Sequence, residues 1–264
     1  MRLFSLLVRC SLCLLCWGVG YALLAQTPEV EMVFQTNGSV FLSGRAKAKQ
    51  AGLGKAASKK QEQLVKRAEE GNKVLLFTNK NKDLSHDELD IDLPEGAEAQ
   101  LSMQEGDLTV EAWSGRLNAR LKKGNITAVG IKGEVDWRSE EGDIAITEAE
   151  LTGGILALNG SVRLVDVTGG VAPLAPKGAV HIELSENYFK KHPETVRLSA
   201  RRGTLHLHQV PEGGEIHWGE GQVRAANIRK PLTVRTEHAT IRLEELAAPL
   251  DVESYANTYV ALSK

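Results

Sequence analysis

The sequence has little cysteine, few aromatic residues and no strong excess of either charge. Its three cysteines, Cys10, Cys13 and Cys16, all lie near the N-terminus, so a chain cut after Ala25 would have neither a disulfide framework nor a thiolate metal site. Aromatic residues make up 5% of the 264 residues and glycine occurs 25 times, which favours many turns over a compact helical core. The formal net charge of −2 lacks the basic footprint of nucleic-acid binding, so we expect no nucleic-acid partner.

Residues 1–25 predict a signal peptide or an N-terminal anchor. Arg2 precedes a mostly apolar stretch that reaches Leu24, and the small residues Ala22 and Ala25 suit cleavage. Arg9 interrupts the apolar stretch, and the part that follows it is short for a membrane-spanning helix. We therefore expect an exported protein of the periplasm, outer membrane or cell surface, with an uncleaved N-terminal anchor as the alternative.

Residues 26–88 predict a small N-terminal cap made of a hairpin, a helix and a strand. Alternating apolar residues on either side of Asn37 and Gly38 favour a β-hairpin over residues 29–44. A capping-box pattern that begins at Ser58, followed by good helix formers, predicts a helix over residues 58–70. A short apolar strand follows at residues 74–77.

An 18-residue repeat organises the chain from residue 89 to residue 264. One pattern, a glycine followed by a short strand of alternating apolar residues, starts at Gly106, Gly124, Gly142, Gly160 and Gly178. The next match starts at Gly203, which is one period plus seven after Gly178. The extra residues fall in the polar stretch 186–194, which we interpret as a loop.

The apolar residues of these units form columns at a constant spacing. Two residues after each lead position, the sequence has Leu108, Ile126, Ile144, Val162, Val180, Leu205, Val223, Ile241 and Tyr259. Four residues after it, the sequence has Val110, Ala128, Ile146, Leu164, Ile182, Leu207, Ala225, Leu243 and Ala261. Alternate residues of a strand point to opposite faces, so each column stacks like on like. The pattern predicts an all-β fold, a β-solenoid with 18-residue rungs, two sheets per coil and a narrow aliphatic interior.

The repeats also carry a family resemblance. The recurring unit of glycine, Asp or Asn and a short apolar strand, preceded by the step from Leu93 to Gly96, resembles the bacterial adhesin-like family called domain of unknown function 4097. The resemblance covers about residues 30–264. It implies an exported or membrane-linked β-solenoid of the cell envelope, and it supplies no catalytic residues.

Two groups of side chains are candidates for a metal site. Asp107, Asn125 and Asp143 share one corner column, but calcium-binding β-rolls need denser Gly and Asp in both turns, so Asx turns explain this column better. His181, His206, His208 and Glu183 fall in outward columns and form a set of zinc-ligand types. Two solvated columns are the simpler interpretation of this second set, so we expect no metal and no cofactor.

An outward arginine column is a candidate binding surface. Arg163, Arg224 and Arg242 continue the column of His181 and His206, and such a stripe would suit anionic envelope polymers or lipid headgroups. Acidic residues are interspersed among the arginines, which is typical of an ordinary solvated face.

The pattern as a whole predicts a non-catalytic exported cell-envelope protein, an adhesin-like interaction module and not an enzyme. The first alternative is a membrane-anchored periplasmic sensor or regulatory partner in envelope stress. The second is a polysaccharide-active enzyme on a β-helix, which would need a cluster of Asp, Lys and Arg that the sequence does not supply. The partner is expected to be an envelope polymer or a protein. Self-association through the open C-terminal end of the solenoid, near Tyr259, is a further possibility.

The assignment of inward and outward columns predicts that two substitutions in the repeats differ in their effect on stability. Ile144→Asp places a charge inside the coil and should lower the free energy of unfolding by about 3 kcal/mol or more. Thr109→Asp, on an outward position, should leave stability nearly unchanged. Circular dichroism during chemical denaturation measures both variants, and equal tolerance of the two changes would contradict the inside-outside assignment.

Overall fold

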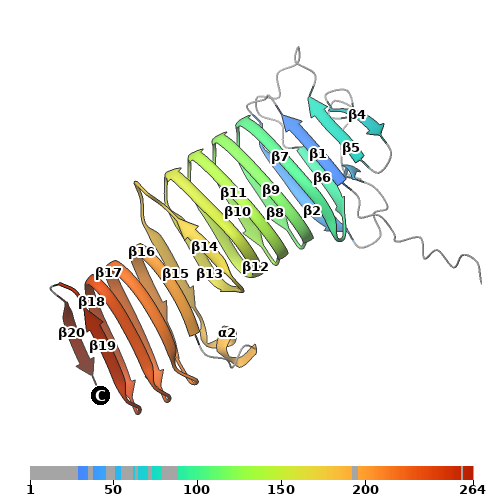
Figure 1. Cartoon of the computed structure of the whole chain (residues 1–264). Helices are drawn as coiled ribbons and strands as arrows, with labels where there is room; N and C mark the ends of the chain where they lie inside the picture. Colours follow the sequence, from blue (N-terminus) through green and yellow to red (C-terminus); the bar gives the residue numbers. More distant parts are fainter. Residues whose placement is uncertain are drawn as a thin grey trace, which may run out of the picture.

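The computed structural model describes residues 29–34, 38–45, 51–54, 62, 65–70, 73–78, 89–191, 196–256 and 258–263. These residues form a β-solenoid of about nine turns, with rungs of roughly 18 residues stacked into a rod (Figure 1). The segment predicted as a signal peptide or anchor, residues 1–25, lies outside the described residues. Among those described, there is no helix of the length and apolar character needed to span a membrane.

Two sheets of parallel strands form the long sides of the coil. The first sheet runs through β6 (Leu89–Pro94), β2 (Val40–Arg45), β8 (Leu108–Glu111), β10 (Ile126–Val129), the first half of β12 (Ile144–Asn159), β13 (Val162–Thr168), β15 (Val180–Leu184), the second halves of β16 (Val196–Leu207), β17 (Gly214–Ile228) and β18 (Leu232–Leu246), and β20 (Tyr259–Ser263). The second sheet runs through β5 (Lys73–Thr78), β1 (Glu29–Phe34), β7 (Ala97–Glu105), β9 (Ser114–Lys123), β11 (Lys132–Glu141), the second half of β12, β14 (Val171–Leu174), the first halves of β16, β17 and β18, and β19 (Leu250–Ser254). Within the described part of the chain, no ladder joins β14 to β16, so the second sheet is interrupted there.

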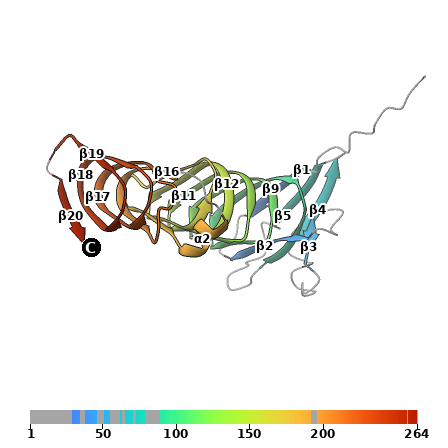
Figure 2. The same ribbon diagram turned by 90° about the horizontal axis from the view of Figure 1, so that it is seen from below.

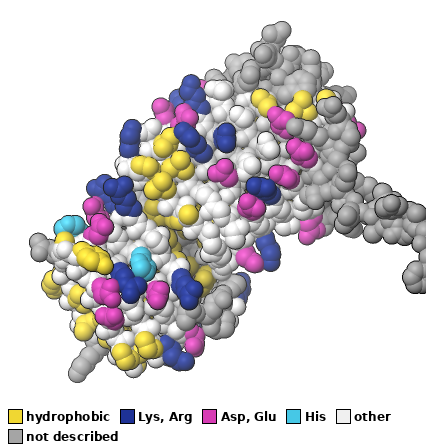
Figure 3. Space-filling model, in the orientation of Figure 1, with side chains coloured by type: hydrophobic (Ala, Val, Ile, Leu, Met, Phe, Trp, Pro, Cys, Tyr) yellow, Lys and Arg dark blue, Asp and Glu magenta, His cyan; other side chains and the backbone are white. Residues whose placement is uncertain are grey.

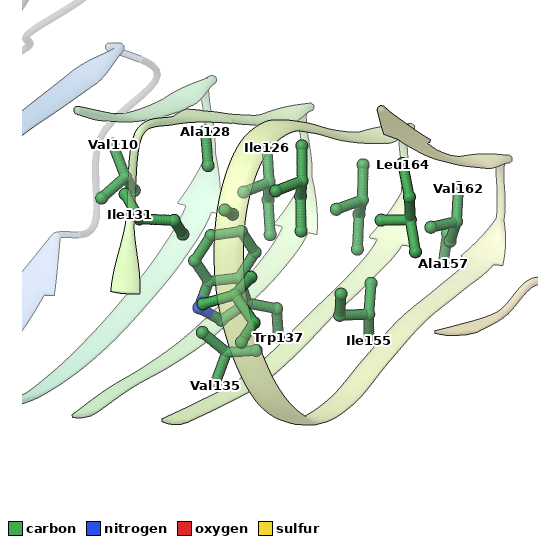
Figure 4. Close-up of a cluster of buried hydrophobic side chains, with 14 of the residues drawn as sticks. Val110, Ile126, Ala128, Ile131, Val135, Trp137, Ile155, Ala157, Val162 and Leu164 are labelled. Atoms are coloured by element: carbon green, nitrogen blue, oxygen red, sulfur yellow. The ribbon is translucent and has the colours of Figure 1, made fainter. Parts of the chain in front are cut away.

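The register confirms the predicted repeat. Ile126 pairs with Leu108 on one side and with Ile144 on the other, one full period away in each direction. These three side chains are fully buried, and Figure 4 shows the apolar columns packed against one another inside the coil. Burial of each such side chain contributes roughly 1.5–3 kcal/mol. The stacked columns therefore stabilise the coil by burial of apolar surface, in a sequence that has no cysteine after Cys16.

The interior is less purely aliphatic than the pattern predicted. Trp113, Trp137 and Trp218 are all buried. Trp137 donates its indole N–H to the Leu117 carbonyl at 3.1 Å, and Trp218 donates to the Gly203 carbonyl at 3.2 Å. Each of these two rings therefore fills the coil between the sheets while its polar atom is satisfied by the backbone.

The prediction of an N-terminal hairpin over residues 29–44 is wrong. β1 lies between β5 and β7 in the second sheet, and β2 lies between β6 and β8 in the first sheet, so the two strands form the two sides of one rung. Both strands carry fully buried apolar side chains, such as Met32 and Leu42, and each therefore needs a place facing the interior. The rung that ends the rod is formed by β5 and β6, which come later in the sequence.

The helix predicted over residues 58–70 is wrong in its second half. Residues 65–70 form β4, which pairs antiparallel with β5, and β3 (Gly52–Leu53) pairs antiparallel with β6. These two strands cover the free edges of the terminal rung, so backbone pairing outweighs helix propensity here. Of residues 58–64, the structure describes Glu62 alone, which is helical.

The stretch predicted as a loop over residues 186–194 begins with a helix. α2 spans Glu186–Lys191, and both views place it on the outside of the coil (Figures 1 and 2). Its Phe189 is buried and anchors it to the coil. Val180 pairs with Gly203, which is one period plus five further on, so the insertion adds five residues and not seven.

The last rung also departs from the predicted register. Val260 pairs with Ile241, which is one position more than a full period before it, and Tyr259 lies opposite the outward Thr240. Tyr259 is 67% exposed, so the placement of Tyr259 and Ala261 in the buried columns is wrong by one residue. Val260 and Leu262 occupy the inward register instead, although both remain exposed at this end of the rod.

At several glycine corners, successive rungs leave no room for a side chain. Gly142 has a φ of 145°, and a Cβ at this position would lie 2.1 Å from the carbonyl oxygen of Gly124. Gly124 stands in the same relation to Gly106, at 2.0 Å. A side chain would push the rungs apart, so Gly124 and Gly142 are required for the close approach as well as for the backbone angle.

Gly142→Ala should therefore lower the free energy of unfolding by at least about 2 kcal/mol, because it adds steric overlap with the backbone to an unfavourable φ. Gly130→Ala is the matched control, since Gly130 has a φ of 64° and no atom within 4 Å of a Cβ. Gly130→Ala should lower the free energy of unfolding by only about 1 kcal/mol, the cost of a left-handed backbone conformation for alanine. Urea denaturation of the two variants measures the difference, and equal losses would argue against a steric role for the corner.

Candidate functional site

The corner column of Asp107, Asn125 and Asp143 is used for stacking. The Asp107 carboxylate accepts a hydrogen bond from the Asn125 backbone N–H at 2.7 Å, and the Asn125 side-chain oxygen accepts one from Asp143 N–H at 2.9 Å. Asp143 continues the series to Ser161 N–H at 2.7 Å. The column forms a series of side-chain to backbone hydrogen bonds that link each rung to the next. The sequence had suggested Asx turns within each corner instead. Its oxygens therefore have a structural role in this arrangement.

Of the four candidate zinc ligands, three lie together next to the insertion: Glu183, His206 and His208. Glu183 on β15 pairs with His206 on β16, and His208 follows the end of β16. Their ligand atoms, one from each side chain, all lie within 4.8 Å of one another. The two imidazole rings are 4.4 Å apart between centroids, and His208 Nε2 lies 3.2 Å from Glu183 Oε1. We call these three residues the His–Glu cluster.

The position of the cluster follows from the alternation of the strands. Ile182, Leu184, Leu205 and Leu207 are buried inside the coil, so the residues between and beside them, Glu183, His206 and His208, face outward. All three are half-buried, and the side chains of Glu183 and His208 are 38% and 37% exposed. The cluster is therefore accessible from solvent and lies at the end of the β15–β16 ladder.

The fourth candidate zinc ligand, His181, lies apart from the cluster. It pairs with Thr204, and its Nδ1 is 2.7 Å from the Thr204 hydroxyl. The expected stacking of His181 on His206 is wrong because the insertion adds five residues and not seven. The shift places Glu183 opposite His206 instead.

The backbone around the cluster is held by the insertion. Ser185 donates its backbone N–H and its hydroxyl to the Asp166 carboxylate, both at 2.7 Å, and its hydroxyl accepts from Tyr188 N–H at 3.3 Å as an N-cap of α2. On the other strand, the His208 backbone N–H donates to the Leu184 carbonyl at 3.1 Å. These bonds fix the two strand ends from which Glu183 and His208 project.

The charges around the cluster are mixed. Partial burial lowers the pKa of His206, and the neighbouring His208 and Arg224 lower it further against the opposite effect of Glu183 and Glu244. Arg224 forms an ion pair with Glu244 at 2.9 Å. Arg163 lies 3.7 Å from the second oxygen of Glu183.

The arginines form two outward columns where one was predicted. Arg224 and Arg242 are in register with His206, whereas Arg163 is in register with His181. Arg163 and Arg224 each lie near a glutamate. The arginines therefore take part in ion pairs and do not form one continuous basic stripe. Lys, Arg, Asp and Glu side chains are intermixed over the visible face of the rod (Figure 3).

A shallow hollow on the second sheet was missed by the sequence analysis. It measures about 600 Å³ and is lined by Arg201, His217, Trp218, Arg235, Thr236 and Tyr255, among others. Arg235 contacts the Glu253 carboxylate at 2.8 Å and 3.5 Å, and this pairing lowers the pKa of Glu253. His217 and Arg235 are one period apart and in register, so the repeat contained a signal for this pair. A second hollow of about 400 Å³ lies beside it and is lined by residues of β14 and β16, the two strands between which the sheet is interrupted.

A comparison with protein-family models finds no match to the chain, and a comparison with curated proteins finds none either.

The surroundings of His206 predict its titration. Its imidazole should titrate below the value of about 6.5 that is typical of histidine. Because the folded-state pKa is lowered, the unfolded chain binds this proton more readily, so His206 protonation reduces stability as the pH falls below about 6.5 and has little effect above it. Titration of the ring by NMR, with a His206→Ala variant for assignment, measures the midpoint. A midpoint at or above about 6.5 would contradict the prediction.

Proposed function

We propose that the chain is a non-catalytic, exported cell-envelope protein that acts as an adhesin-like interaction module, as its resemblance to the adhesin-like solenoid family implies. The observation that carries the proposal is the rod itself, which presents outward side chains in columns along about nine turns. Strands in such a ladder are about 4.8 Å apart, so the same chemical group recurs at a short and regular interval. A surface of this kind suits an extended partner with its own repeat, such as an envelope polymer or an extended protein segment.

The outward ion pairs support a polar mode of binding. Arg116 lies between Glu98 and Glu134 on neighbouring rungs, at 3.6 Å and 3.3 Å, and Lys132 pairs with Glu150 at 2.7 Å. These residues are exposed, so each pair contributes little to stability and remains free to exchange partners with a ligand. The two hollows on the second sheet are shallow, which favours contact along the surface there over enclosure of a small substrate.

The alternative is a membrane-anchored periplasmic sensor or regulatory partner. The observation that favours it is the N-terminal apolar stretch, which has small residues for cleavage at Ala22 and Ala25 but no decisive cleavage signal. In that case the same rod would face a partner inside the envelope and would remain attached to the membrane.

Fractionation of cells that produce the full chain separates the two functions. For the adhesin-like module we expect a mature N-terminus after Ala22 or Ala25, determined by mass spectrometry, and digestion of the protein by protease added to intact cells. A periplasmic marker that resists the same protease is the control for cell integrity. An intact N-terminus in a membrane fraction that resists salt and alkali would favour the sensor, and cleavage of an envelope polysaccharide by the pure protein would overturn both.

A further inference from the structure

The His–Glu cluster combines the side-chain types and the geometry of a metal site. We propose that Glu183, His206 and His208 bind one divalent transition-metal cation, with zinc as the best match, and leave one coordination position open to the outside. This assignment is independent of the proposed interaction function, since it concerns one end of β15 and β16 and not the length of the rod.

The distances fit a metal that draws the three groups together. Zinc binds imidazole nitrogen and carboxylate oxygen at about 2.0–2.2 Å, so ligand atoms of a tetrahedral site lie about 3.3 Å apart. The nearest pair, His208 Nε2 and Glu183 Oε1, is already at 3.2 Å. The remaining atoms lie within 4.8 Å, a spread that rotation of exposed side chains can close.

The ladder pre-positions the ligands without a change of fold. His206 and His208 are two residues apart and face the same side of the strand, and Glu183 lies opposite His206 in a parallel pair. The Ser185–Asp166 hydrogen bonds and the His208–Leu184 backbone bond fix both strand ends. A buried Phe189 holds α2 beside them.

The ligand types select the class of cation. Two imidazoles with one carboxylate suit zinc and its neighbours in the first transition row, whereas calcium and magnesium prefer oxygen ligands alone. Arg163 and Arg224 lie nearby and oppose a cation, but Arg224 is paired with Glu244.

Three protein ligands leave a fourth tetrahedral position for water or for an outside group. Zinc sites with two histidines, one glutamate and an open position are a recognised arrangement. Because the cluster is half-exposed, the open position faces solvent, where a donor from a partner can reach it.

Zinc titration of the purified full chain, prepared without a histidine tag and freed of metal with a chelator, tests the proposal by calorimetry. We expect one zinc ion per chain. His206→Ala, His208→Ala and Glu183→Gln should each weaken binding at least tenfold, and calcium should give no heat of binding. Circular dichroism of each variant checks the fold, which outward substitutions should preserve. Should a variant lose its fold, visible absorption of the cobalt(II)-loaded wild-type chain still reports whether a tetrahedral site with histidine ligands forms.

His181→Ala and His217→Ala are the matched controls, since both remove an outward histidine that lies apart from the cluster. Each should bind zinc like the wild type. Wild-type uptake no greater than that of His206→Ala would overturn the proposal. So would an equal loss in the two controls, because that result would mean dispersed binding to surface histidines. A cobalt(II) spectrum of octahedral type in the wild type would also count against it.

Discussion

The close approach of successive rungs at the glycine corners is the constraint on which the rest of the fold depends. A Cβ on Gly124, Gly142 or Gly160 would overlap the preceding corner's carbonyl oxygen, so these corners stack backbone on backbone. The residue after each glycine then caps the next rung, as Asp107 does for Asn125. Where consecutive corners are fixed in this way, as from Gly106 to Gly160, each residue pairs with its counterpart one period away. The like-on-like columns, inside and outside, follow from that single spacing.

The same constraint shapes the surface. Outward residues that recur once per rung must lie about 4.8 Å apart, so like charges in one column would repel unless acidic groups come between them. The chain meets this requirement with Arg116, which lies between two glutamates. Arg224 is in register with Arg242, and its ion pair with Glu244 offsets the repulsion there. The ends of the rod have strand edges without a neighbouring rung, and these edges must be covered in another way. At the N-terminal end, β3 and β4 cover the edge by antiparallel pairing, and their sequence carries no trace of the repeat.

How far the sequence predicts this structure depends on whether a residue belongs to the repeat. Ile126 and Ile144 are recognisable as core because their neighbours one period away are apolar too. Residues 65–70 have good helix formers and no repeat partner, but Glu70 pairs with Lys73 across Gly71 and Asn72, a two-residue sequence typical of a hairpin turn. The sequence therefore contained a local signal for the β4–β5 pair, which the helix prediction overlooked. β1 and β2 are the reverse case, since their two alternating stretches around Asn37 and Gly38 suit a hairpin that does not form. Their true partners, β5 to β8, come much later in the chain, beyond the helix-like segment, and give no local signal.

The His–Glu cluster shows why a periodic sequence can specify a core and still leave a site undecided. An insertion of seven residues would put His181 opposite His206, and one of five puts Glu183 there. The two registers differ by two residues, so every inward side chain stays inward and every outward one stays outward. Burial therefore cannot choose between them, although the outward neighbours differ completely. Contacts outside the repeat accompany the observed register: the buried Phe189 anchors α2, and the His208 backbone N–H donates to the Leu184 carbonyl. The arrangement of the cluster therefore depends on the length of the insertion, at the place where the insertion breaks the repeat.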